Sequence, residues 1–175
     1  SMLSETPVTW RSANDVTFEV PMTVFGSGSI MYQADSDEDG AGTVSFSSVA
    51  SVTVSDSAVQ QIVVTAADVI LEANMKAMQA NVTVQVSNHS GSTLSVGANN
   101  GGLHLSDAEL DRITTATTLT LGSLQTDQVF VDGVSHVDTP ADVYIISMDS
   151  VEFKGAASSF KTRVGIHSDN DIDVS

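Results

Sequence analysis

The chain has 175 residues, 41% of them hydrophobic, which suits a single domain with a sizeable core and not a disordered segment. Its formal net charge of −16 comes from 22 acidic and 6 basic residues, so nucleic acid and anionic lipid are excluded as favourable partners. There is no cysteine for disulfides or thiolate metal sites, and no apolar run reaches the roughly 18 residues of a membrane-spanning helix.

The start of the chain bears on its domain organisation. Ser1-Met2 resembles the residues that remain after a protease removes an expression tag, and no signal peptide is visible. We therefore expect residues 3–175 to form one domain, as a fragment of a longer protein whose neighbouring domains are among its partners.

Apolar and polar residues alternate in short runs along almost the whole chain. Successive side chains of a strand point to opposite faces, so each run predicts a strand with one buried face. The runs are about three to six residues long and mostly roughly 8–14 residues apart, a spacing typical of a β-sandwich or a β-solenoid. They include Val16/Phe18/Val20, Ile30/Tyr32, Val44/Phe46, Val52/Val54, Ile62/Val64, Val82/Val84/Val86, Leu94/Val96, Leu119/Leu121, Val129/Val131, Val143/Ile145 and Val164/Ile166.

The turns favour the solenoid over the sandwich. Tight two-residue hairpin turns are scarce, and the best candidates are Asn100-Gly101 and Asp132-Gly133. A faint repeat places Asp immediately before a strand-forming Val, at 15–16, 68–69 and 142–143. Two or three strands per coil give an expected repeat of roughly 20–30 residues. We predict an all-β fold, a β-solenoid with one short helix, and keep the β-sandwich as the alternative.

An acidic stretch, Asp35-Ser36-Asp37-Glu38-Asp39-Gly40, has the pattern with which calcium loops begin. Carboxylates at alternate positions can surround one ion while the glycine makes a sharp turn. The EF-hand version fails, because its twelfth loop position, which needs a bidentate Glu, is Phe46. In a calcium loop between strands, the ninth position that would want Asp is Thr43. We predict calcium at Asp35, Asp37 and Asp39, with a solvated acidic loop as the alternative. The second acidic run, residues 169–173, is a weaker candidate that also reads as the outward face of a last strand.

A helix is predicted over residues 106–113. Ser106 is a good N-cap, and Glu109 three residues later completes a capping box. Leu105 and Leu110 can pack as a hydrophobic staple, and Ile113 continues the apolar stripe. The β-branched Thr114-Thr115 is expected to end the helix.

The stretch Gly102–Ser123 contains this helix and the following segment Thr118-Leu119-Thr120-Leu121-Gly122. It resembles a recurrent sequence motif of filamentous-haemagglutinin-like proteins. The entry Ala13-Asn14-Asp15-Val16 is similar to strand entries in the same family. The resemblance implies a right-handed parallel β-helix in a very large exported surface protein, often an adhesin, and it brings no catalytic residues. The chain departs from the family in its acidic insertion at 35–39 and in its irregular repeat lengths.

Enzymatic chemistry has weak support in the sequence. The four histidines, His89, His104, His136 and His167, form no recognisable metal motif. Lys161 and Arg163 are expected on one strand face, where they could clamp an acidic sugar, and Trp10, Tyr32 and Tyr144 are the few candidates for sugar stacking. No phosphate-binding glycine loop or nucleophile elbow is present.

We therefore expect a non-enzymatic, structural and adhesive segment of a secreted or cell-surface protein, with calcium as its cofactor. It would display a face for a glycan or a cell-surface protein. The alternatives are a carbohydrate-active β-helix (polysaccharide lyase, hydrolase or epimerase) and a calcium-dependent β-sandwich adhesion module.

Overall fold

The computed structural model describes residues 2–4, 7–54, 58–87, 91–136 and 142–174, which are mostly β-strand with one short helix. All the strand pairs among these residues are parallel. The antiparallel hairpins of the sandwich alternative are thus not observed there. The hairpin candidates lie after or at the end of strands that pair in parallel: residues 100–101 follow β12, and Asp132 is the last residue of β16.

Within the described ranges, the strands form five open sheets. Sheet A contains β1 (Met2–Ser4), β4 (Met22–Gly26), β7 (Val52–Val54), β10 (Met75–Met78) and β14 (Ile113–Thr115). Sheet B contains β2 (Val8–Arg11), β5 (Gly28–Gln33), β8 (Val59–Ala66), β11 (Asn81–Val86), β15 (Thr118–Gly122), β18 (Asp142–Ser147) and β21 (Val164–Ser168).

The three remaining sheets are shorter. Sheet C contains β3 (Val16–Phe18), β6 (Thr43–Phe46) and β9 (Asp68–Leu71). Sheet D has the order β13 (Leu103–Leu105), β12 (Thr93–Gly97), β16 (Gln128–Asp132), β19 (Ser150–Phe153) and β22 (Asp171–Val174). Sheet E pairs β17 (Ser135–His136) with β20 (Ser159–Phe160).

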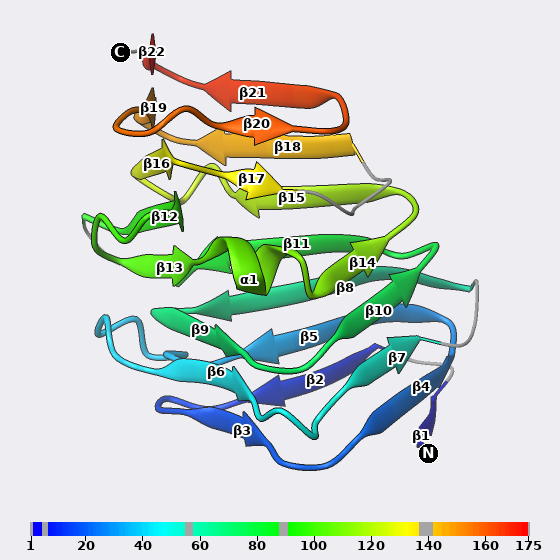
Figure 1. Cartoon of the computed structure of the whole chain (residues 1–175). Helices are drawn as coiled ribbons and strands as arrows, with labels where there is room; N and C mark the ends of the chain where they lie inside the picture. The colour runs from blue at the N-terminus through cyan, green and yellow to red at the C-terminus, as the bar shows by residue number, and fades with distance from the viewer. Residues whose placement is uncertain (1, 5–6, 55–57, 88–90, 137–141, 175) are drawn as a thin grey trace.

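The chain visits these sheets in a repeating order. After β1, it runs through sheets B and C as β2 and β3, then returns to sheet A as β4, and the next two turns repeat this path. Figure 1 shows the turns stacked from the N-terminus at one end to the C-terminus at the other. In sheet B, Ile30 pairs with Ile62, Ile62 with Val82, and Val82 with Leu119. Each sheet is therefore assembled from segments far apart in sequence.

The alternation predicted from the sequence places one face of most strands inside the stack. Buried Val, Ile and Leu side chains lie above one another in register, as Val64, Val84, Leu121 and Ile145 do in sheet B. The N-terminal end of the core is aromatic instead, since the rings of Trp10 and Tyr32 stack with centroids 5.0 Å apart, and those of Phe18 and Phe46 at 4.9 Å.

The repeated Asp-Val entry has a local explanation at two of its three positions. The Asp15 Oδ1 atom accepts a hydrogen bond from the backbone N–H of Thr43, 2.8 Å away, at the start of the neighbouring strand β6. The Asp68 Oδ1 atom accepts one from the N–H of His104, in β13. Asp142 differs, because its carboxylate pairs with the guanidinium of Arg163. The aspartates therefore satisfy backbone donors or a cation of the adjacent turn of chain.

The repeat length is irregular, and one turn is longer than the predicted range. The offset between partners in sheet B is 20 residues from Ile62 to Val82 but 37 from Val82 to Leu119. The long turn contains β12, β13 and α1 (Asp107–Leu110), so it exceeds the predicted 20–30 residues. In Figure 1 the helix lies beside β13, on the front of the stack.

The helix confirms its predicted start and corrects its end. Ser106 is the N-cap, and the capping box with Glu109 is present. The helix ends at Leu110, earlier than predicted, and Ile113 belongs to β14. Ile113 pairs with Met75 of sheet A, so strand pairing in the stack overrides helix propagation.

Candidate functional site

The predicted calcium residues lie in the loop of residues 34–42, which connects β5 to β6. Asp35 is fully buried, and its positive φ of 54° turns the chain out of β5. Gly42 follows with a φ of 132°, and a Cβ there would come within 2.5 Å of the Asp35 nitrogen. The loop therefore folds back closely on its own start, which requires a glycine at 42.

The Asp35 carboxylate organises this loop. It accepts hydrogen bonds from the backbone N–H groups of Asp39, at 2.9 Å, and Gly40, at 3.2 Å, and from the hydroxyl of Ser87. The Ser36 carbonyl oxygen accepts a hydrogen bond from the Arg11 guanidinium at 3.0 Å. Ser87 and Arg11 are distant in sequence, and no sequence pattern links either of them to the loop.

Asp35, Asp37 and Asp39 converge as the sequence predicted. One carboxylate oxygen of each lies within 4.8 Å of the other two, and the side chains of Asp37 and Asp39 are exposed. Calcium binds oxygens at 2.3–2.6 Å, so two of its ligands can be at most about 5 Å apart. The three carboxylates fit one calcium ion, whose six to eight ligands would be completed by carbonyl oxygens or water. Glu38 instead lines a hollow on the outside of sheet B.

The other metal candidates do not assemble. Among the residues that the structure describes, the group at 35, 37 and 39 is the one set of three acidic or histidine side chains that converges in this way. In the second acidic run, Asp169 pairs with His167 at 3.3 Å, and Asn170 donates to Asp149. The His104 ring contacts the Gly97 carbonyl oxygen at 2.8 Å. His89 and the side chain of His136 lie outside the described part.

The predicted cationic clamp is wrong. Lys161 and Arg163 precede β21, in a turn, and so do not share a strand face. Arg163 pairs with Asp142, whose hydrogen bond and charge raise the pKa of the guanidinium. Lys154 is also occupied, because its Nζ atom lies 3.5 Å from the centroid of the Phe130 ring and 3.5 Å from a Glu152 carboxylate oxygen.

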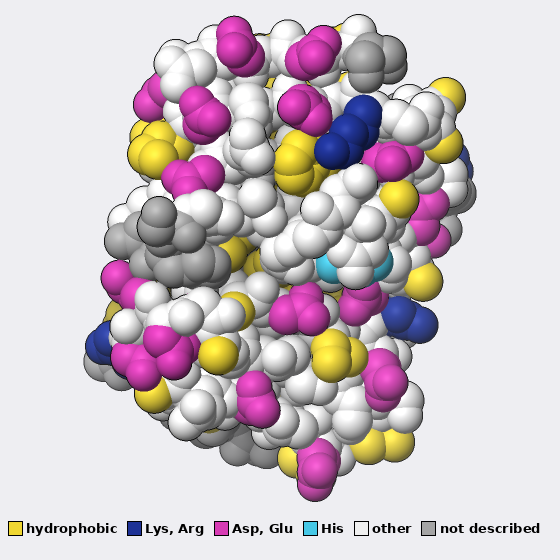
Figure 2. Space-filling view, turned by 90° about the vertical axis from the view of Figure 1, so that its left-hand side faces the viewer, with side chains coloured by type: hydrophobic (Ala, Val, Ile, Leu, Met, Phe, Trp, Pro, Cys, Tyr) yellow, Lys and Arg dark blue, Asp and Glu magenta, His cyan; other side chains and the backbone are white. Residues whose placement is uncertain are grey.

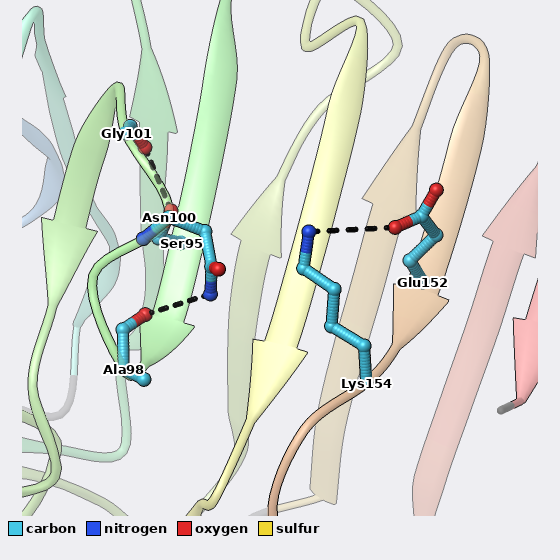
Figure 3. Close-up of polar contacts among 6 residues, drawn as sticks. All are labelled: Ser95, Ala98, Asn100, Gly101, Glu152 and Lys154. Carbon is cyan, nitrogen blue, oxygen red and sulfur yellow. Dashed lines mark hydrogen bonds and ion pairs between the residues drawn. The ribbon is translucent and has the colours of Figure 1, made fainter.

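Figure 3 shows this Lys154–Glu152 pair and also the 98–102 connection between β12 and β13, which β16 separates from β19 in sheet D. The Ser95 hydroxyl donates to the Gly101 carbonyl oxygen at 2.7 Å and accepts from the Asn100 N–H at 3.1 Å. The Asn100 side-chain amide donates to the Ala98 carbonyl oxygen. These hydrogen bonds lie within the connection itself, so we interpret it as a structural turn.

The three aromatic residues predicted as candidates for sugar stacking differ in their exposure. Tyr32 is completely buried, and Trp10 is half-buried against Phe18 and Tyr32. Neither ring therefore offers the free surface for sugar stacking that the sequence predicted. Tyr144 is 39% exposed on the outer side of sheet B. Its availability follows from the position of β18 in the sheet, which the sequence does not give.

In comparisons with known proteins, no family model, curated protein or solved structure matches this chain. None of the helical residues in the described ranges forms a segment long and apolar enough to cross a bilayer. Functional inference therefore depends on the chain's own surfaces. Figure 2 shows that acidic side chains are spread over the side of the molecule it presents, with few Lys and Arg side chains among them.

Proposed function

We propose that this chain is a segment of a right-handed parallel β-helix, or β-solenoid, in a large secreted or cell-surface protein of the filamentous-haemagglutinin-like kind. Its role is structural and adhesive: it holds a binding face for glycan or protein away from the surface. The observation that carries the proposal is the repeated return of the chain to the same parallel sheets, in register, with the termini at opposite ends. Such stacking makes continuous side faces, which suit display.

A binding and cleavage experiment tests this role. The immobilised chain is presented with an array of neutral and acidic glycans and with cell-surface glycoproteins, and the same glycans are assayed in solution for new reducing ends and for unsaturated lyase products. We expect binding without cleavage, because Lys161 and Arg163 form no clamp at a substrate groove. Release of glycan fragments would replace the display role by the carbohydrate-active alternative.

Calcium is proposed to rigidify the loop at Asp35, Asp37 and Asp39. We expect a higher thermal midpoint in calcium than in chelator, and no such difference after Asp37→Ala and Asp39→Ala together. Magnesium at equal ionic strength is the ion control, because it demands a more rigid octahedral site. The pair Asp171→Ala and Asp173→Ala removes the same charge from exposed positions on β22 and should keep the calcium effect. Superimposable wild-type melts in calcium and chelator would contradict the site.

A further inference from the structure

The centre of sheet B is uncharged in a strongly acidic protein. The four adjacent strands β5, β8, β11 and β15 contain no Asp, Glu, Lys, Arg or His, although the chain has a net charge of −16. Charges begin at the borders, with Arg11 on β2 and the Asp142–Arg163 pair at β18. We call the outward side of these four strands, together with Tyr144, the neutral face.

Strand structure alone does not explain this lack of charge. Sheet D is also parallel, and its outer side carries Asp132, Glu152, Asp171 and Asp173 on three successive strands. Exposed strand positions in this protein therefore accept carboxylates readily. The neutral face is therefore a local exception. An uncharged partner can cover it without removing water from a charged side chain, which would cost free energy.

Two rows of outward side chains cross the neutral face in register. One row is polar and consists of Gln33, Thr65 and Gln85 on β5, β8 and β11. The Gln85 amide donates to the Thr65 hydroxyl at 3.1 Å, which fixes both groups. No hydrogen bond to the side-chain amide of Gln33 or of Gln125, a nearby loop residue, is found within the described ranges. These amides remain available to a ligand.

The second row runs beside the first and is partly apolar. It continues from Met31 and Val63 through Thr83 and Thr120 to Tyr144. A hollow opens on the outside of β5, β8 and β11. It is lined by Met31, Gln33, Thr65, Gln85, Ser87 and Gln125, and by Asp35 and Glu38 of the 34–42 loop. Thr65 forms part of its floor, since it points outward yet is only 9% exposed, and Val63 of the second row is 8% exposed.

Tyr144 gives the far end of the second row an aromatic surface. Its ring lies against the backbone of Gly165 on β21, where an added Cβ would come within 2.8 Å of two ring carbons. The absence of a side chain at Gly165 therefore allows the Tyr144 ring to pack against the β21 backbone. From β5 to β18 the neutral face spans four strand spacings, about 19 Å at about 4.8 Å each.

This chemistry matches a sugar chain. Amides and hydroxyls both donate and accept, as vicinal sugar hydroxyls do, and the Met31–Val63 strip and the Tyr144 ring suit the apolar C–H side of a pyranose. An acidic sugar would meet the field of a protein with charge −16, whereas an uncharged one would not. We propose that the neutral face binds an uncharged oligosaccharide, which lies across the strands from the hollow to Tyr144. This inference rests on the proposed display role, and the hollow adjoins the proposed calcium loop through Asp35 and Glu38.

The test uses isothermal titration of the full chain with short linear oligomers of glucose, mannose, galactose and N-acetylglucosamine, and with oligogalacturonate as the anionic comparison. We expect at least one neutral series to bind and the anionic series not to bind. Gln33→Ala with Gln85→Ala, and separately Tyr144→Ala, should each raise Kd about tenfold or more. Tyr144→Phe keeps the ring and should bind like wild type.

The matched control is Gln128→Ala, which removes a half-exposed amide from sheet D and should leave Kd unchanged. Thermal melts of every variant establish that loss of binding is not loss of folding. Equal binding by wild type and face variants, binding of oligogalacturonate alone, or a protein ligand in place of any sugar would overturn the site. Cleavage of the oligosaccharides would instead contradict the display role, so the two failures are distinguishable.

Discussion

At the scale of single residues, two buried polar side chains near the N-terminal end have opposite surroundings. The Asp35 carboxylate accepts hydrogen bonds from two backbone N–H groups and from Ser87. The Tyr32 hydroxyl is buried and finds no hydrogen-bond partner in the described part of the chain. A satisfied buried group is costly to remove, whereas an unsatisfied one is costly to keep.

Replacement of Asp35 by Ala should lower the free energy of unfolding by about 1–3 kcal/mol, because it leaves backbone donors without their acceptor. Urea denaturation in the presence of chelator measures this loss without any contribution from calcium. Asp37→Ala removes an exposed carboxylate from the same loop and should change the unfolding free energy by less than about 0.5 kcal/mol. Equal effects of the two substitutions would contradict the anchoring role of Asp35.

Replacement of Tyr32 by Phe should leave the protein equally stable or stabilise it by up to about 1 kcal/mol. Burial raises the pKa of Tyr32 above its ordinary value of 10.0. Above about pH 10 the unfolded chain releases this proton while the folded chain keeps it, so stability falls as pH rises and is unaffected at neutral pH. Tyr32→Phe should weaken this alkaline loss, measured by urea titrations at about pH 8 and pH 11.

At the scale of elements, the short helix α1 is held by tertiary contacts as much as by its own cap. Glu109 accepts a hydrogen bond from the N–H of Ser106, as a capping box requires, and also accepts from the Ser106 hydroxyl and from the N–H of Leu71 in β9, at 3.1 Å. The Arg112 guanidinium donates to the Leu71 carbonyl oxygen at 2.8 Å. Both backbone groups at the end of β9 are thereby satisfied by residues in or just after the helix.

Glu109→Ala should therefore destabilise the protein more than Ser106→Ala. Loss of the N-cap hydroxyl costs about 1 kcal/mol, whereas loss of the carboxylate also leaves the Leu71 N–H unpaired, for a total of about 2 kcal/mol or more. Ala108→Ser, at an exposed position of the same helix, is the control and should have little effect. Chemical denaturation ranks the three variants, and a larger cost for Ser106→Ala would show that the link to β9 is unimportant.

At the scale of the whole molecule, the stack ends in open strand edges. The last strand of sheet D, β22, is exposed along its whole length, and its Ile172 and Val174 are 52% and 76% exposed. Such an edge is a template for pairing with another chain. Asp171 and Asp173 lie on the same strand, and their charges oppose the approach of a second acidic molecule.

Neutralising this edge should promote self-association. Asp171→Asn with Asp173→Asn is expected to shift the sedimentation distribution from monomer toward larger species as concentration rises, because the repulsion that guards β22 is removed. Asp37→Asn with Asp39→Asn changes the net charge by the same amount at a loop away from this edge and should remain monomeric. Association of both variants alike would mean that overall charge, and not the edge, keeps the molecules apart.

The sequence by itself determined the local structure. Alternation specified most strands and their buried faces, Ser106 and Glu109 specified the start of the helix, and the spacing of Asp35, Asp37 and Asp39 specified their convergence. These features depend on residues at most a few positions apart, for which backbone geometry alone fixes the relative placement.

Contacts between turns of the chain were decided by the tertiary structure. It ended the helix at Leu110 and placed Lys161 and Arg163 between β20 and β21. It also aligned Gln33, Thr65 and Gln85 in one row of the neutral face, and put Tyr144 at the far end of the second row. The physical reason is that parallel partners are joined by connections of variable length, here 20 to 37 residues between partners in sheet B. A period-two pattern fixes which face each strand buries, but it carries no information about which residue of the next turn lies beside it.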